Sequence, residues 1–244
     1  MLKPWLALAG MLVSASALAE PVKLGHTIGP VGTTCTEVRS NTVKASANGR
    51  TIEQRSNIAK TIEVLAVGAS AVTKAKITYT AHTMTNRDVS AIVGPTYLVT
   101  FDNGTVTFAR VDGKQLLAEE NSLLERDNKR FGKPDVFADA LVGIPFEKGK
   151  TTTIPADKLA AWDEFPQPVT AAMTLTDVKG ANAHFSIELT AGAAGGQQLL
   201  LKGTAVLERS TGRVLSLDGD GKFSDLKATG TIHTAATETC KAKR

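Results

Sequence analysis

Residues that could carry chemistry are few and scattered in this sequence. Its four histidines are His26, His82, His184 and His233, and none are paired at the spacing of three to five residues that a zinc site uses. His82 continues the polar side of a strand pattern that begins at Lys76, so we expect it to face solvent. The histidines therefore predict no metal site.

Three short motifs resemble reactive sites but stand in the wrong context. Ser224-Asp225-Leu226-Lys227 matches S-x-x-K, which requires a helix N-terminus, whereas this segment has the pattern of a strand and turn. Asp218-Gly219-Asp220-Gly221 does not fit the spacing of a calcium loop, and we interpret it as a tight turn. Asp163 and Glu164 adjoin Trp162, but adjacent carboxylates rarely face each other across a sugar.

The chemistry of the chain therefore predicts a protein that is not an enzyme and needs no cofactor. An unrecognised hydrolase is the minor alternative, because convergent catalytic sites leave no linear motif.

The two cysteines, Cys35 and Cys240, lie near opposite ends of the chain. In an oxidising compartment such a pair usually forms a disulfide. The chain-entropy model assigns a loop of this size about 5 kcal/mol of stabilisation. Because bonded cysteines have Cα atoms within ~7 Å, the bond predicts that the first and last strands lie side by side. It would also curl the sheet toward a barrel.

The first 19 residues have the features of a cleavable signal peptide. Lys3 precedes an apolar run over residues 6–18, and Ala17-Leu18-Ala19 predicts cleavage after Ala19. The run is shorter than the ~20 residues that span a bilayer. The residue after the cleavage point is a glutamate, not the cysteine of a lipid-anchored protein. We therefore expect a soluble periplasmic or secreted protein with no transmembrane segment.

The formal net charge is +4, with basic and acidic residues interleaved along the chain. No basic run is interleaved with aromatic residues, so nucleic acid is not an expected partner. Weak attraction to an anionic membrane surface or polysaccharide stays open.

Strand patterns flank a central segment of different character. Residues 22–111 and 169–240 alternate between polar and apolar side chains, as Ile77, Tyr79 and Ala81 do on one predicted face. Asn48-Gly49 and Asn103-Gly104 predict hairpin turns, because asparagine and glycine adopt the positive φ of a type I′ turn.

Residues 114–165 predict a helical insert between these two strand regions. Paired leucines indicate a helix over 114–131, in which Ser122 and Glu125 could form a capping box. Shorter helices are predicted over 135–142 and 155–162.

The predicted fold is mainly β (α+β), in one domain over residues 20–244. It is a curved antiparallel sheet or half-barrel with the small central helical insert packed on it.

The insert also holds five of the twelve aromatic residues of the chain. They either fill the core beneath the insert or line an apolar pocket there. This set is Phe131, Phe137, Phe146, Trp162 and Phe165.

The layout resembles the periplasmic lipoprotein-carrier class, in which helices form a lid over the apolar cavity of an unclosed barrel. The order of signal peptide, early strands, central helices and late strands carries this resemblance. The second half, from Gly203-Thr204 to Leu217, also resembles exported bacterial β-rich proteins of unknown function.

These observations favour an exported non-enzymatic protein that binds an apolar or amphiphilic ligand, such as a lipid or lipoprotein, under the insert. The alternative is an envelope interaction or structural module that binds another protein through its sheet surface.

Overall fold

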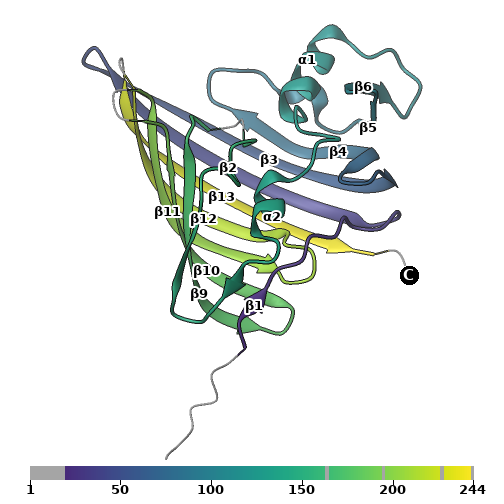
Figure 1. Cartoon of the computed structure of the whole chain (residues 1–244). Coiled ribbons are helices and arrows are strands. Elements are labelled where there is room, and N and C mark those ends of the chain that lie inside the picture. Colours follow the sequence, from purple (N-terminus) through teal and green to yellow (C-terminus); the bar gives the residue numbers. More distant parts are fainter. Residues whose placement is uncertain (1–19, 163–164, 194–195, 226–227, 243–244) are drawn as a thin grey trace, which may run out of the picture.

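One long antiparallel sheet dominates the computed structural model of the chain (Figure 1). The structure describes residues 20–162, 165–193, 196–225 and 228–242. The main sheet has 11 strands in the order β6-β5-β4-β3-β2-β13-β12-β11-β10-β9-β8, and β1 and β7 form a separate pair. The predicted signal peptide, residues 1–19, lies outside the described residues.

Each half of the chain builds one side of the sheet as a meander. The first meander comprises β2 (Thr34–Ala47), β3 (Arg50–Val67), β4 (Val72–Met84), β5 (Thr96–Asp102) and β6 (Thr105–Arg110), with a short 3-10 helix, η1 (Ser90–Ile92), between β4 and β5. The second comprises β8 (Thr151–Ile154), β9 (Val169–Lys179), β10 (Asn182–Ala191), β11 (Gln198–Glu208), β12 (Val214–Ser224) and β13 (Thr229–Lys241). The predicted strand regions are confirmed, except that β1 (Val22–Lys23) pairs with β7 (Pro145–Phe146) outside the main sheet.

Both predicted hairpin turns are confirmed. Asn48 and Asn103 have φ values of 50° and 48°, and each is followed by a glycine with positive φ. The turn predicted at residues 218–221 is wrong, because this segment lies inside β12. Gly219 stands directly opposite Gly203 on β11. A Cβ added to Gly203 would lie 2.1 Å from the Asp218 carbonyl oxygen. The glycines therefore allow two strands to approach closely, as glycine does inside sheets.

The two terminal strands of the meanders meet at the centre of the sheet. β2 pairs with β13 along its whole length, and Cys35 lies opposite Cys240. The predicted disulfide between these cysteines is present. The prediction that the first and last strands lie side by side is therefore confirmed for β2 and β13. These two strands lie at the centre of the sheet and not at its edges, because each meander grows outward from this pair and leaves β6 and β8 at the edges. The curved sheet is therefore open along the described strands, and not a closed barrel.

The central insert connects the two edges of the sheet and contains both helices and strands. It holds α1 (Ala118–Asp127) and α2 (Val136–Leu141), which confirms two of the three predicted helices in shorter form. The third, predicted over 155–162, is instead a series of turns, in which the Leu159 N–H bonds the Ala156 carbonyl at 3.1 Å. The β-branched residues 151–154 form edge strand β8 and not helix, in keeping with their β propensity.

A buried carboxylate anchors α1 to the sheet. Glu120 accepts hydrogen bonds from Leu117 N–H at 2.8 Å, Tyr97 Oη at 2.7 Å and Arg110 Nη1 at 2.9 Å. The bond to Leu117 is one half of a capping box, one turn earlier than the predicted pair of Ser122 and Glu125. Burial works against ionisation of Glu120, but its three donors hold its pKa below the ordinary value.

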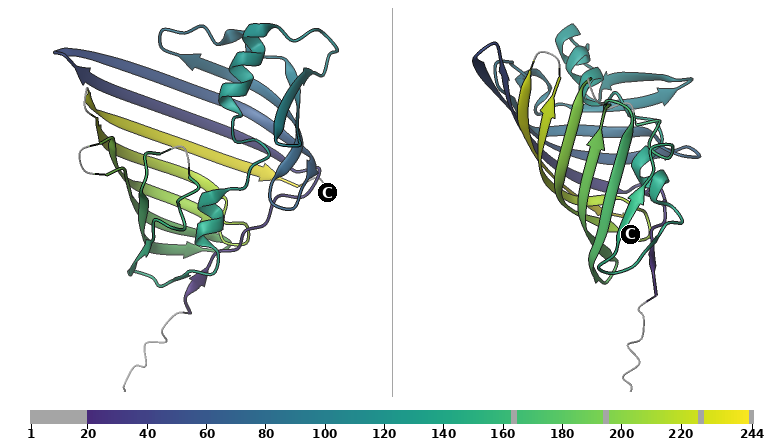
Figure 2. Two further views of the ribbon diagram at one scale, coloured as in Figure 1. Left: turned by 45° about the horizontal axis from the view of Figure 1, so that its top comes forward. Right: turned by 60° about the vertical axis from the view of Figure 1, so that its left-hand side comes forward.

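The apolar residues form two separate cores on one face of the sheet. The N-terminal core packs α1 and η1 on β4 and β5, and the C-terminal core packs α2, β1 and β7 on β8–β11. Figure 2 shows both helices on the same side of the twisted sheet. The N-terminal core consists of Ile77, Tyr79, Val89, Ile92, Tyr97, Val99, Leu123 and Leu124.

Loss of the disulfide should destabilise the protein strongly. The double substitution Cys35→Ser and Cys240→Ser removes a crosslink between residues 205 positions apart, so the unfolding free energy should fall by about 3–5 kcal/mol. Guanidinium unfolding of the exported protein measures this change. If a reducing agent does not change the unfolding midpoint of the wild-type protein, the disulfide contributes nothing to its stability.

Removal of the Glu120 carboxylate should loosen α1. Glu120→Ala leaves the Arg110 guanidinium and the Tyr97 hydroxyl without their buried partner, at a cost of about 3 kcal/mol. Glu119→Ala on the same helix is the matched control, because Glu119 is exposed and its loss should cost less than about 0.5 kcal/mol. Equal unfolding midpoints for the two variants in urea would contradict the anchoring role.

Candidate functional site

Three of the five predicted site residues meet beside α2. The ring centroids of Phe137 and Trp162 are 5.2 Å apart, and those of Trp162 and Phe165 are 4.8 Å apart in an edge-on arrangement. All three side chains are only partly buried and pack against the C-terminal core. We call Phe137, Trp162 and Phe165 the aromatic triad.

Local structure fixes the position of the triad. The Asp135 carboxylate caps α2 by accepting hydrogen bonds from Phe137 N–H and Ala138 N–H, each at 3.1 Å. The turns after β8 bring Trp162 back over the helix, where its carbonyl accepts a hydrogen bond from Gln167 Nε2 at 2.8 Å. The triad is therefore held by a capped helix and a bonded loop.

The other two predicted site residues lie elsewhere. Phe146 is fully buried and packs edge-on against Phe185 at 5.0 Å, so it belongs to the solid centre of the C-terminal core. Phe131 packs against the N-terminal core. The insert therefore does not gather its five aromatic residues into a single group, because α1 and α2 dock on different cores.

A small cavity lies on the segments that carry the triad, although none of the three aromatic rings is among its lining residues. Its volume is about 390 Å³, and its lining includes Val136 and Ala161, the chain neighbours of Phe137 and Trp162. The remaining lining residues are Arg130, Lys133, Pro134, Asp139 and Lys158. Among the described residues Lys133 and Lys158 have no ion-pair partner, whereas the Asp139 carboxylate contacts His26 Nδ1. The cavity therefore joins an apolar wall to a positively charged rim.

The basic lining residues were missed in the sequence. Lys129-Arg130 and Lys133 form a local concentration of positive charge just after α1, which is the signal that could have found them. Lys158 comes from a separate turn, and only the fold brings it to the same cavity.

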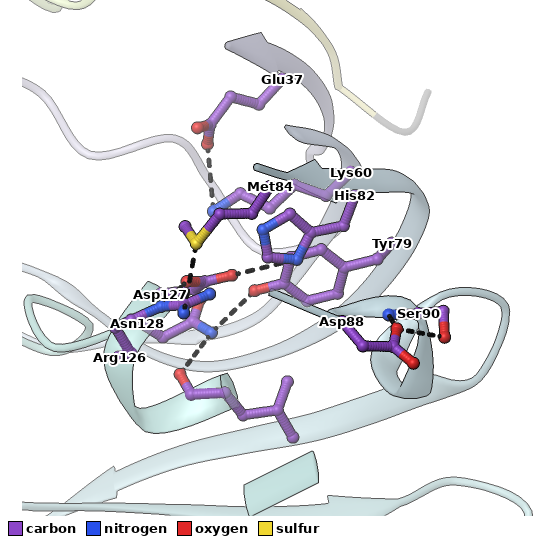
Figure 3. Close-up of polar contacts among 11 residues, drawn as sticks. Glu37, Lys60, Tyr79, His82, Met84, Asp88, Ser90, Arg126, Asp127 and Asn128 are labelled. Atoms are coloured by element: carbon purple, nitrogen blue, oxygen red, sulfur yellow. Dashed lines mark hydrogen bonds and ion pairs between the residues drawn. The ribbon is translucent and has the colours of Figure 1, made fainter. Parts of the chain in front are cut away.

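A second notable feature is a band of charged residues on the central strands, of which Figure 3 draws Glu37 and Lys60. On the core face of the central strands, Glu37 lies opposite both Lys60 on β3 and Glu238 on β13. Lys60 Nζ is 3.3 Å from Glu37 Oε2, and both side chains are largely buried. Burial raises the pKa of Glu238, and Arg213 opposes this shift. The band therefore interrupts the apolar surface where β2 meets β13.

His82 belongs to this band, which corrects the expectation that it faces solvent. Ala59 pairs with Ala81 and Lys60 pairs with Tyr79, so Thr80 is an extra residue in β4. Such a bulge shifts the alternation of side chains by one position. His82 is consequently buried, whereas Ala81, predicted on the face of Ile77 and Tyr79, is exposed.

The buried His82 ring is poorly satisfied. Among the described residues neither of its nitrogens has a hydrogen-bond partner, and Nδ1 lies 3.6 Å from Asp127 Oδ2 on α1. Asp127 is also paired with Arg126 at 2.9 Å. Next to it, Asn128 Nδ2 donates to Tyr79 Oη at 3.0 Å. Burial lowers the pKa of His82, although the Asp127 carboxylate opposes this shift.

The remaining sequence candidates form no reactive arrangement. Among the described residues the one group of three possible metal ligands is Cys35, Glu238 and Cys240, whose two sulfurs are bonded to each other. The S-x-x-K motif begins at the end of β12 and not on a helix, and its Lys227 lies outside the described residues. Asp163 and Glu164 also lie outside them. No helix of the described chain is long and apolar enough to cross a bilayer.

His82 should make the stability of the protein depend on pH. Since its folded pKa lies below its unfolded value of about 6.5, the unfolded chain binds a proton first as the pH falls. The unfolding free energy should therefore decrease as the pH drops from 7 through about 6.5, and His82→Met should remove part of this decrease. Urea unfolding at several pH values measures it, with partly buried His184→Met as control. Parallel pH curves for wild type and His82→Met would contradict the assignment.

Comparisons with known proteins give little further guidance. No family model and no curated protein matches the chain. A mutant porin from Rh. blastica is 7% identical over 85% of this chain and 100% of its own, with a TM-score of 0.28. A DUF1329 family protein from Desulfovibrio piger is 7% identical over 87% of this chain and 86% of its own, with a TM-score of 0.22. At such low scores, the functional argument comes from the geometry of this chain alone.

Proposed function

We propose that this chain is an exported, non-enzymatic binding protein that holds an amphiphilic ligand at the aromatic triad beside α2. The carrying observation is a group of half-buried aromatic rings on the segments whose neighbouring residues, Val136 and Ala161, line a cavity with basic side chains. Clefts of this kind, apolar with a few convergent polar groups, are the usual form of small-molecule sites.

The triad supplies the apolar half of the site. Aromatic side chains bury large areas, and the three rings here are neither fully covered nor fully exposed. An acyl chain laid against Trp162 and Phe165 would remove their remaining surface from water, which is favourable at roughly 25 cal/mol per Å².

The rim supplies a preference for a negative head group. Lys133 and Lys158 line the cavity, and its one acidic residue, Asp139, already contacts His26. A carboxylate or phosphate head would gain charge-assisted hydrogen bonds from these ammonium groups. The proposed ligand is therefore an anionic amphiphile such as a fatty acid or an acidic lipid.

The proposed compartment is the periplasm or the medium. A disulfide that closes nearly the whole chain suits an oxidising compartment, in agreement with the signal peptide predicted over residues 1–19.

A structural or interaction role is the alternative. The edge strands β6 and β8 each pair on one side only within the described sheet, and unpaired edges are templates for β-strand addition by another protein. This alternative needs no ligand at the triad.

Ligand binding should be visible in the fluorescence of Trp162, because the other tryptophan, Trp5, lies in the predicted signal peptide. We expect oleate to shift the emission of the mature protein. Phe165→Ala should weaken binding about tenfold, since a buried phenylalanine contributes 1.5–3 kcal/mol.

Two controls separate binding from general destabilisation. Phe131→Ala removes a partly buried ring from the other core and should retain oleate affinity. Lys133→Glu combined with Lys158→Glu should weaken binding of oleate but not of the neutral ester monoolein. Emission unchanged by either lipid, or equal losses for Phe165→Ala and Phe131→Ala, would overturn the proposal and favour the interaction module.

A further inference from the structure

A second cavity lies at one end of the central strands, and none of its lining residues belongs to the aromatic triad or to the cavity beside α2. It has a volume of about 800 Å³ and is lined by residues of β2, β3 and β10–β13. Its lining includes two lysines, Lys44 and Lys222, and six hydroxyl side chains, namely Ser46, Thr51, Thr190, Ser224, Thr229 and Thr231. We call it the hydroxyl groove.

The strand register aligns these side chains in two rows. In one row Thr231 lies between Lys44 on β2 and Lys222 on β12, and Lys222 lies opposite Leu200. In the other row the side chains are, in order across the sheet, Gln198, Ser224, Thr229, Ser46 and Thr51. Directly opposite residues of antiparallel strands share a face, so each row presents its side chains together.

The two rows lie on the face opposite the two cores, although Leu199 and Ala191 of the core face also contribute to the lining. Leu199 and Ile232, which pack on the C-terminal core, alternate with the residues of the rows. The groove is therefore separate from the site proposed above and does not depend on it.

The charged residues that line the groove are all positive. No aspartate or glutamate lines it. Lys222 has no ion-pair partner among the described residues, and Lys44 Nζ lies 3.5 Å from a Glu53 carboxylate that Arg55 holds more closely at 2.6 Å. Of the acidic residues further along these strands, Glu188 is paired with Lys202 at 2.7 Å and Asp220 with His233 at 3.1 Å. An anionic ligand would therefore enter without repulsion from the lining.

Two of the hydroxyls are held in place before any ligand binds. Ser46 Oγ and Thr51 Oγ1 are 3.0 Å apart and hydrogen-bonded, and threonine side chains have restricted χ1 angles. Each hydroxyl can both donate and accept, which suits a ligand that itself carries many hydroxyls.

The spacing of the lysines indicates an extended ligand. They stand on strands separated by β13, so their backbones are about 10 Å apart, twice the distance between neighbouring strands. A single phosphate or sulfate would fill only a small part of the cavity. The lining has no arginine and one aromatic residue, Phe223, so it lacks the stacking platform that single-stranded nucleic acids use.

From these observations we infer that the hydroxyl groove binds an acidic glycan, with Lys44 and Lys222 on its negative groups and the threonine and serine hydroxyls on its sugar hydroxyls. A carboxylated polysaccharide or a phosphorylated sugar polymer has this chemistry.

The inference is tested with a carboxylated alginate oligosaccharide and the mature protein, by isothermal titration calorimetry at low and physiological salt. We expect Lys222→Gln to weaken binding about tenfold, because a hydrogen bond to a charged group contributes this much. Lys202→Gln is the matched control: it removes the same charge from the same face, but Lys202 is outside the groove. Equal losses of alginate affinity for the two variants would indicate non-specific electrostatic attraction and overturn the inference.

Inorganic polyphosphate separates sugar recognition from charge alone. The double variant Thr229→Val and Thr231→Val should bind alginate about tenfold more weakly and polyphosphate as wild type does. Absence of alginate binding by the wild type, or unchanged binding by the double variant, would overturn the inference. Phe165→Ala should bind alginate as the wild type does. A failure of the glycan inference can therefore be distinguished from a failure of the lipid-binding proposal.

Discussion

The pairing of β2 with β13 is the constraint on which the rest of the structure depends. Because these strands come from the two ends of the described chain and meet at the centre of the sheet, each half of the chain must grow outward as a meander. The disulfide between Cys35 and Cys240 locks this pairing covalently. The segment between β6 and β8 must then cross from one edge of the sheet to the other, and it carries α1 and α2 over one face.

This crossing explains why the molecule has two cores and not one. α1 docks at the first edge through Glu120, and α2 docks at the other through the C-terminal core. Between them the central strands present Glu37, Lys60 and Glu238, of which Lys60 and Glu37 form an ion pair while burial raises the pKa of Glu238. His82 lies at the margin of this band, beside the end of α1.

The same architecture separates the two proposed binding surfaces. The core face carries the aromatic triad at the α2 end, whereas the opposite face of the central strands is polar and carries the hydroxyl groove. A sheet with one face packed and one face solvated can present different chemistry on each side, because side chains alternate along every strand. The two proposed sites therefore share no lining residue.

The sequence by itself determined the local elements, since they depend on nearest neighbours. Alternating side chains predicted the two strand regions, Asn48-Gly49 and Asn103-Gly104 predicted their turns, and two lone cysteines predicted their bond. Only the tertiary structure decided that Cys240 lies at the centre of the sheet. It also decided that Phe131 and Phe137 pack on different cores and that Lys158 and Lys133 line the same cavity. A single extra residue, Thr80, reversed the predicted orientation of His82. Such outcomes depend on pairing between distant strands, which short-range periodicity does not encode.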